Sequence, residues 1–414
     1  MKLNAVIAGV GMTRFMKYPD KGLKELGTEA TRAALADAGL EPADLDGAFV
    51  GNCAAGLVTG QESIRGQVVL DSMGIGKIPI VNVENACASG STAFVQASAM
   101  VSAGLHDVVL ALGVEKLSHP DKSKSFAAFA GAMDVDELKQ MMEDLAKAAA
   151  ESARGGDGGE GGGGAGQSRS MFMDVYAGAA RSHMEKYGTT REQFAMVSAK
   201  NSLHGSLNPN AQFHEVLSVE DVLADREIVY PLTRSMCSPI GDGAAAAVIL
   251  SERKARELGV EKPVRIATTV MHSGYNHAED EPDTVQLSSA EAFEEAGLGP
   301  DDLDLAEVHD ASAPAEIIAY EQIGLCKPGE GGRLVEEGVT RLGGRLPVNT
   351  SGGLLRKGHP VGASGLAQVV EISDQLRGRA GKRQVEGARR GLAQNGGGKK
   401  GNDAAAMVVT ILES

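Results

Sequence analysis

The sequence predicts an α/β protein assembled from two similar halves, each with a buried sheet covered by helices. Short runs of Val, Ile and Leu alternate with alanine-rich helical stretches, a pattern typical of buried strands between helices. One segment occurs twice, with ten of 19 positions identical. The 414 residues suffice for two ordinary domains or for one duplicated domain, and the repeated segment favours duplication.

From the N-terminus, an apolar run within Met1–Gly11 predicts the first strand, because it lacks the charged leader and long apolar core of a targeting peptide. The first copy of the repeated segment follows at Ala34–Asn52 (ALADAGLEPADLDGAFVGN). Its second copy is Ala292–Asp310 (AFEEAGLGPDDLDLAEVHD), at an offset of 258. Each copy predicts a helix closed by glycine, then a proline turn and a strand.

Two shorter repeats follow in the same order. Cys87–Gly90 (CASG) matches Gly362–Gly365 (GASG) at an offset of 275, and Asp242–Leu250 matches Asn402–Thr410. Three matched segments in one order indicate a tandem duplication, with two similar sheets. The small side chains of CASG and GASG predict two central helices that pack closely, since large side chains would hold them apart.

An insertion at residues 117–234 interrupts the first half before its last strands. It holds a predicted helix, Val135–Arg154, and a run of 12 residues with nine glycines, Gly155–Gly166, for which we expect a flexible surface loop. No strand precedes this run and no Gly-Lys-Ser/Thr follows it, so a phosphate-binding loop is not predicted. The expected units are 1–116 with 235–253, the inserted 117–234, and 254–414.

Composition limits the partners. With 40 basic and 55 acidic residues the formal charge is −15, which argues against nucleic acid and anionic membranes. No stretch of 18 apolar residues predicts a membrane span. Anionic small ligands stay compatible, because helix N-termini hold phosphates. The four cysteines have no Cys-x-x-Cys spacing, which predicts reduced thiols in a cytoplasmic protein and no metal site.

The first candidate for chemistry is Cys87, predicted where a strand meets a helix. The positive end of a helix lowers the pKa of a thiol and favours the thiolate. The offset of 275 places His359 opposite Glu84, just ahead of the partner helix, so a pseudo-two-fold axis would bring both helix starts into one crevice. A neutral imidazole there could take the thiol proton. A small buried hydrophobe at Cys87 and a loop cap at His359 remain the alternatives.

Two other segments end near this crevice. His309 could hydrogen-bond an acyl oxygen and Asp310 could orient its neighbours, because strand ends facing such a crevice bind ligands in α/β proteins. Gln394–Gly398 precedes the last repeated strand, and the bare backbone N–H groups around Asn395 and Gly396 suit an oxyanion hole. Ordinary turns are the alternative for both segments.

Four motifs together resemble the thiolase superfamily. They are NACASG at 85–90, VHD at 308–310, GHP at 358–360 and AQNGGG at 393–398. The His-Asp pair, where other thiolases have Asn-Glu, is similar to the sterol-carrier-protein-2-type thiolases. The resemblance implies a five-layered αβαβα thiolase fold, with residues 117–234 as a loop domain over coenzyme A, and a homodimer formed through the first half.

The resemblance also implies a ping-pong reaction, of the kind used in β-oxidation. Cys87 would take an acyl group from a 3-oxoacyl-CoA and pass it to coenzyme A, with His359 as its activator. His309 and His359 would form one oxyanion site, and the backbone N–H groups of Cys87 and Gly396 the other. Coenzyme A and acyl-CoA would be substrates, with no permanently bound cofactor and no metal.

One expected residue of the family is missing. The second acid/base of thiolases falls at Gln394 in most members and at Ala311 in the similar subfamily, and Ser312 replaces the phenylalanine of that motif. His309 could handle the α-proton, or Cys53, which the duplication aligns with Ala311 but which we expect to lie too far away. Retro-aldol cleavage or acyl transfer with a small zinc-ribbon/OB-fold subunit, and a catalytically inactive interaction subunit, remain alternatives.

Overall fold

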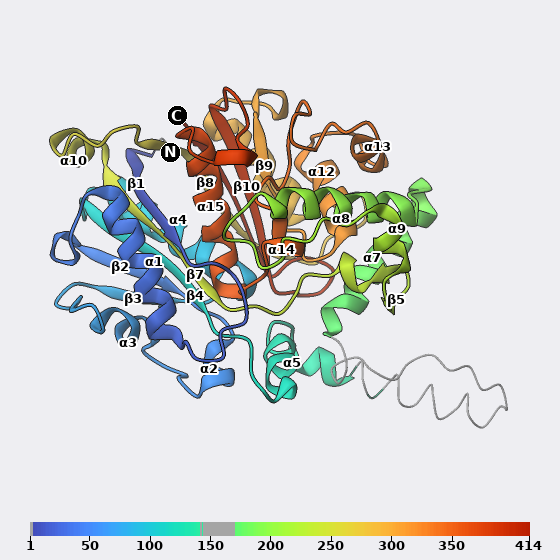
Figure 1. Ribbon diagram of the computed structural model, residues 1–414, viewed down its shortest axis with the longest axis horizontal. Helices are drawn as coiled ribbons and strands as arrows, with labels where there is room; N and C mark the ends of the chain where they lie inside the picture. Colours follow the sequence, from blue (N-terminus) through green and yellow to red (C-terminus); the bar gives the residue numbers. More distant parts are fainter. Residues whose placement is uncertain (1–2, 141–142, 144–169) are drawn as a thin grey trace.

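The computed structural model describes residues 3–140, 143 and 170–414 (Figure 1). Its main sheet has nine strands in the order β3-β2-β4-β7-β1-β8-β11-β10-β9. The first half contributes β1 (Ala5–Met12), β2 (Gly47–Gly51), β3 (Ile80–Val83), β4 (Val108–Glu115) and β7 (Gly243–Ser251). The second half contributes β8 (Val264–Ser273), β9 (Leu305–Glu307), β10 (Arg390–Gly397) and β11 (Ala406–Glu413). A separate ribbon pairs β5 (Glu227–Val229) with β6 (Leu232–Thr233).

The strand order confirms the duplication. The sequence β2-β4-β7-β1 in the first half has the same pairing as β9-β10-β11-β8 in the second, with one parallel pair followed by two antiparallel pairs. The expected two sheets are, however, joined into one. β1 and β8 are the inner edges of their halves, and their free backbone groups pair over a short stretch, Val6 with Arg265 and Ile7 with Val264.

Helices form the remaining layers. α1 (Leu23–Ala38) and α3 (Arg65–Asp71) cover the outer face of the first half, and α11 (Thr284–Ala296) covers that of the second. α4 (Ser89–Ser102) and α15 (Ser364–Leu376) pack against each other between the two sets of strands, as Figure 1 shows. This arrangement is the predicted five-layered fold. Among the described helices, none combines the length and apolar character needed to cross a bilayer.

The other helices belong to all three units. They are α2 (Ala55–Thr59), α5 (Lys122–Ala130), α7 (Met171–Tyr187), α8 (Arg191–Ser206), α9 (Val219–Ala224), α10 (Glu252–Glu257), α12 (Ala313–Ile323), α13 (Gly331–Glu336) and α14 (Gly353–Arg356). Of these, α2 and α10 lie in the first half and the rest in the insertion or the second half. The described start of the predicted helix Val135–Arg154 is helical over residues 135–140. The rest of that helix, apart from residue 143, and the glycine run Gly155–Gly166 lie outside the described residues.

Local sequence explains the repeated elements. Gly39 and Gly297 end α1 and α11 in the same left-handed conformation, with φ of 66° at both. Small residues allow the two central helices to touch, as predicted. A Cβ added at Gly90 would lie 2.6 Å from the carbonyl oxygen of Gly362, and one at Gly365 only 1.8 Å from Oγ of Ser91. The two helix starts are therefore held together by glycine contacts.

Candidate active site

Cys87 lies where the sequence places it, in a 3₁₀ turn (Ala86–Ala88) between β3 and α4. Ala86 has φ of 48°, which is unfavourable for a residue with a side chain, and its N–H donates to Glu84 at 2.6 Å. This turn presents Cys87 to a cavity of about 1110 Å³ that His309 and His359 also line. The strained residue thus stands directly before the candidate nucleophile.

The three predicted side chains meet in this cavity. The Cys87 sulfur and one ring nitrogen each of His309 and His359 all lie within 4.8 Å of one another. The two imidazole rings meet edge to face, with centroids 5.3 Å apart and planes at 82°. His309 follows β9, and His359 precedes the 3₁₀ turn that starts α15. The duplication therefore brings a thiol from the first half to two imidazoles from the second.

Hydrogen bonds fix which nitrogen of His359 carries a proton. Its Nδ1 lies 2.7 Å from Oγ of Ser364, and that hydroxyl donates its single proton to the carbonyl of Pro360 at 3.0 Å. Ser364 must therefore accept from Nδ1–H, which leaves Nε2 free to accept a proton. Burial, with His309 and Lys357 nearby, holds the pKa of His359 well below 6.5, so its ring is neutral.

His309 is held in the opposite tautomer. The amide of Asn395 donates to Nδ1 of His309 at 2.9 Å, while its oxygen accepts from the hydroxyl of Ser91 at 2.5 Å. Nε2 of His309 therefore carries the proton and can donate. Burial lowers the pKa of His309 to about 4. The cavity contains one neutral imidazole that accepts and one that donates, and Asn395 acts by orienting the donor.

The expected low pKa of Cys87 is wrong. Burial raises the pKa of this thiol to about 12, outweighing the backbone N–H groups of Gly398 and of Cys87 itself, which favour the thiolate. The desolvation of the sulfur thus exceeds the benefit of the helix start. The N–H beside the sulfur also belongs to Gly398 rather than to Gly396. Gly396 lies within β10, whereas Gly398 has left the strand with φ of 65°.

Asp310, the other half of the His-Asp pair, organises the loop that leads to His359. Its carboxylate accepts from the N–H of Leu354 at 2.6 Å and from the amide of Asn201 at 2.8 Å. A Cβ at Gly353 would lie 2.1 Å from this carboxylate, so only glycine allows the close approach. Burial and the nearby Glu316 raise the pKa of Asp310 well above its usual range. These contacts are the ones that an orienting role for Asp310 would require.

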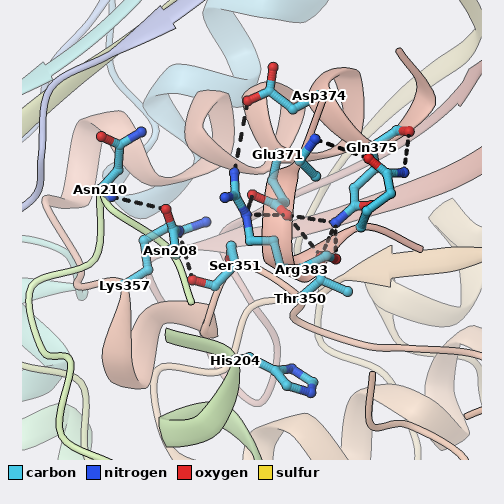
Figure 2. Close-up of polar contacts among 12 residues, drawn as sticks. His204, Asn208, Asn210, Thr350, Ser351, Lys357, Glu371, Asp374, Gln375 and Arg383 are labelled. Carbon is cyan, nitrogen blue, oxygen red and sulfur yellow. Dashed lines mark hydrogen bonds and ion pairs between the residues drawn. The ribbon is translucent and has the colours of Figure 1, made fainter. Parts of the chain in front are cut away.

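A buried polar network holds the residues that precede and follow His359, and Figure 2 shows the part of it around Glu371 and Arg383. Lys357, two residues before His359 and 1% exposed, pairs with Glu307 at 3.4 Å. Glu307 also accepts from the N–H of Ser351 at 3.0 Å. A second buried carboxylate, Glu371, is held by Thr350, Gln375 and Arg383. Protein groups hydrogen-bond or pair with both carboxylates. The loop that carries His359 is therefore held rigidly.

The two positions of the missing acid/base have structural roles. The side-chain oxygen of Gln394 accepts from the N–H of His309 at 2.9 Å, and its amide contacts the sulfur of Met407 at 3.2 Å. Ala311 lines the cavity with only a methyl group. The side chain of Ser312 is buried and does not line the cavity. None of these side chains supplies a titratable group near neutral pH.

Cys53 is closer than expected, because it lines the same cavity as Cys87 and packs in the same apolar cluster. The cause is Glu115, which is fully buried. Its carboxylate accepts from the N–H of Cys53 at 3.1 Å and from the N–H of Gly362 at 3.0 Å, so it ties the Cys53 loop to the second helix start. Burial raises the pKa of Cys53 well above its ordinary value.

Three functional candidates escaped the sequence analysis. Ser91 and Ser364 set the two histidine tautomers, and the repeat held a signal for Ser364, since it matches Ser89 in CASG. Tyr176, from α7, lines the cavity, and burial raises its pKa, with a smaller contribution from Cys87. Nothing in the sequence of the insertion indicates that this tyrosine faces Cys87.

The arrangement offers a nucleophile, a neutral base and three oxyanion donors. The donors are Nε2–H of His309 and the backbone N–H groups of Cys87 and Gly398. The three ligand atoms of Cys87, His309 and His359 also lie close enough to hold a soft cation such as Zn²⁺. The same groups also fit acyl transfer, which needs a thiol, a base that takes its proton and hydrogen-bond donors for the oxyanion.

Comparison with known proteins agrees with this geometry. Residues 5–229 match the family described as thiolase, N-terminal domain, and residues 268–412 match thiolase C-terminal domain-like. The chain is 40% identical over 406 residues to the acetyl-CoA acetyltransferase of Methanothermobacter thermautotrophicus, covering 97% of this chain and 98% of that protein. It is 37% identical over 422 residues to sterol carrier protein 2 of Homo sapiens, covering 98% and 71%. The solved Ltp2-ChsH2(DUF35) aldolase is similar with a TM-score of 0.77 and 26% identity, covering 100% and 99%.

Proposed function

The chain belongs to the thiolase superfamily, and we propose that it is a C-acyltransferase that cleaves 3-oxoacyl-CoA thioesters through an acyl intermediate on Cys87. Coenzyme A accepts the acyl group, and it and its thioesters are substrates rather than resident cofactors. The observation that carries the proposal is the approach of the Cys87 sulfur to nitrogens of His309 and His359 within 4.8 Å.

In the first half of the reaction the Cys87 sulfur attacks the 3-oxo carbon. Nε2 of His359 takes the thiol proton as the bond forms, because burial disfavours a free thiolate. The N–H groups of Cys87 and Gly398 donate to the oxyanion. Its collapse breaks the bond between carbons 2 and 3, leaving the acyl group on sulfur and an enolate of acetyl-CoA. The proton held by His359 balances the one that this enolate needs.

In the second half coenzyme A attacks the acyl-sulfur carbonyl. Its thiol proton passes to His359 and from there to the departing Cys87 sulfur, which restores the free enzyme. In the first half of the reaction, Nε2–H of His309 donates a hydrogen bond to the thioester oxygen of the enolate. This donor is what a second oxyanion site requires. The neutral state of both imidazoles supports these roles, because one must accept a proton and the other must donate a hydrogen bond.

The residue that delivers the α-proton is the open step, with His309 and Cys53 as the proposed alternatives. His309→Ala should abolish cleavage of 3-oxoacyl-CoA while acetyl-CoA still acylates Cys87, since acylation by a simple thioester moves no α-proton. Cys53→Ala should do the same if Cys53 delivers it. Unchanged turnover in either variant removes that residue from the step.

A second candidate function is retro-aldol cleavage of a 3-hydroxyacyl-CoA. Its support is the similarity to an aldolase whose name joins two proteins, together with the methyl group of Ala311 where an acid/base would stand. We propose on this basis that a small zinc-ribbon/OB-fold subunit binds the chain. Copurification from the native source tests this, and a chain that elutes alone and is fully active contradicts it.

We also propose a homodimer formed through the first half. β3 is the open edge of the sheet and exposes Val81, while α4 leaves Ala99 exposed and Met100 half-buried. Such an edge pairs readily with a second copy.

The four cysteines are free thiols, which supports a location in the cytoplasm.

The decisive experiment is mass spectrometry of the protein after incubation with a 3-oxoacyl-CoA and no free coenzyme A. We expect an acyl adduct on the peptide that contains Cys87, with release of acetyl-CoA, and its discharge when coenzyme A is added. Product analysis with a 3-hydroxyacyl-CoA then tests the aldol reaction. A protein that forms no adduct and cleaves neither substrate would be the remaining alternative, a catalytically inactive interaction subunit.

A further inference from the structure

We propose that the slot between α7 and α12 is an acyl channel that selects thioesters with a large apolar acyl group over acetoacetyl-CoA. The inference rests on the proposed function, because it places the acyl chain of the same substrate. The channel belongs to the cavity that contains Cys87 and runs outward from Ala311.

One wall is a single face of α12. The cavity-lining residues of this helix are Ala315, Ile318, Ala319 and Gln322. Their spacing of three and four residues places them on one side of the helix. Most of α12 is buried, yet Ala315 and Ile318 are partly exposed, so this face looks onto open space. α12 begins two residues after Ala311, next to His309, so the wall starts at the reacting centre.

The opposite wall has the same periodicity. On α7 the cavity-lining residues are Phe172, Met173, Val175, Tyr176 and Ala179, again mainly three and four apart, and the two helices pack together. Ala179 is exposed, so the outer end opens toward solvent. From Ala315 to Ala319 to Gln322 the helix rises about 10 Å.

The chemistry of the walls identifies the ligand. The residues of α7 and α12 that line the channel carry no charge, and the amide of Gln322 at its outer end already donates to Asp283 at 2.5 Å. The cations that line the cavity, such as Arg226 and Arg234, come from other segments. A charged chain would lose its hydration here without a partner, whereas an apolar chain gains from burial. The small side chains of Ala179, Ala315 and Ala319 leave space for the acyl chain.

The test measures binding in a Cys87→Ala background, where no turnover occurs. Dissociation constants of acetyl-CoA, octanoyl-CoA and palmitoyl-CoA are determined by titration calorimetry. We expect affinity to rise with acyl length, by about tenfold or more between acetyl-CoA and palmitoyl-CoA. Ala315→Phe, which fills the channel, should lower the ratio of long-chain to short-chain affinity about tenfold. Ala36→Phe on α1, outside the cavity, is the matched control and should keep the ratio.

Equal affinities across the series, or a ratio that Ala315→Phe does not change in a protein that melts normally, overturn the channel. Ala179→Phe, on the other wall, repeats the test should Ala315→Phe fold poorly. A length-dependent affinity combined with no cleavage of any 3-oxoacyl-CoA by the unaltered protein would reject the proposed reaction and keep the channel, so the two failures are distinguishable.

Discussion

The two helix starts that meet at the cavity share one local design and differ in what they carry. Each is a 3₁₀ turn leading into an α-helix, at Ala86–Ala88 and at Val361–Ala363. The first has the strained Ala86 and the proposed nucleophile Cys87, while the second follows the proposed base His359 and has no residue with positive φ. In the proposed reaction, the duplication supplies one scaffold twice and different side chains divide the chemistry between the two copies.

The surroundings of the two copies also differ, because the second copy is more completely buried than the first. α15 is buried along its whole length except at Asp374, whereas α4 leaves Ala99 exposed. At the sheet edges β3 exposes 41% of Val81, while β9 is fully buried and Ala306 bridges to Val348. The second half is closed by its own chain. The first half retains an open helix face and an open edge, which is what a second copy would cover.

The largest expected effect removes the group that only the first helix start has. Cys87→Ala should lower cleavage of 3-oxoacyl-CoA more than about 10³-fold, because no other side chain replaces the covalent intermediate. Turnover is measured by following acetyl-CoA release. Cys326→Ala, a partly buried thiol outside the cavity, is the control. Residual turnover near the level of the control would mean that the two starts do not divide the chemistry in this way.

The second change acts on the other helix start. His359→Asn keeps a polar side chain but removes the base, so the rate of Cys87 acylation should fall about 10²- to 10⁴-fold. Rapid-quench measurement of the acyl adduct isolates this step. His272→Asn, on β8 and outside the cavity, should leave the rate unchanged. A loss in coenzyme A binding with a normal acylation rate would make His359 a loop residue rather than the base.

A third change tests the open edge of the first half. Val81→Asp places a charge on β3, where pairing of two copies would bury it, so the dimer should dissociate at protein concentrations about 10²-fold higher than before. Sedimentation at several concentrations measures this. Lys77→Asp, at an exposed position just before β3, separates a general charge effect from an effect at the edge. A dimer that persists in Val81→Asp places the interface elsewhere.

Sequence alone anticipated the parts of the site that depend on the repeat. The offset of 275 brought Cys87 and His359 together, and the segment repeated at an offset of 258 placed His309 at the end of its strand. It failed where three-dimensional surroundings decide the outcome. The pKa of Cys87 depends on desolvation, which cannot be inferred from a sequence motif. Cys53 lies at the cavity because the buried Glu115 hydrogen-bonds its loop. Tyr176 reaches the cavity from an insertion whose packing has no counterpart in the other half.

The smallest expected effect concerns the proton on His359. Ser364→Ala removes the acceptor for Nδ1–H, so the ring also populates the tautomer with Nε2–H and less of the enzyme holds a competent base. We expect kcat to fall about tenfold with KM nearly unchanged. Ser373→Ala is a close control, since this residue lies on the same helix and its buried hydroxyl has no hydrogen-bond partner within the described residues.

The pH profile separates this role from simple destabilisation. Because burial holds the pKa of His359 well below 6.5, the activity of the unaltered enzyme should persist as the pH falls through 6.5 and decline only at lower pH. Ser364 also stabilises the imidazolium, which donates through Nδ1, so its removal should move the acid limb to lower pH while reducing the rate throughout. A limb that moves upward in Ser364→Ala, or an equal loss in Ser373→Ala, would show that the hydroxyl supports the helix and does not set the tautomer. The second helix start would then contribute only the ring, and the division between the two copies would be simpler than the hydrogen bonds indicate.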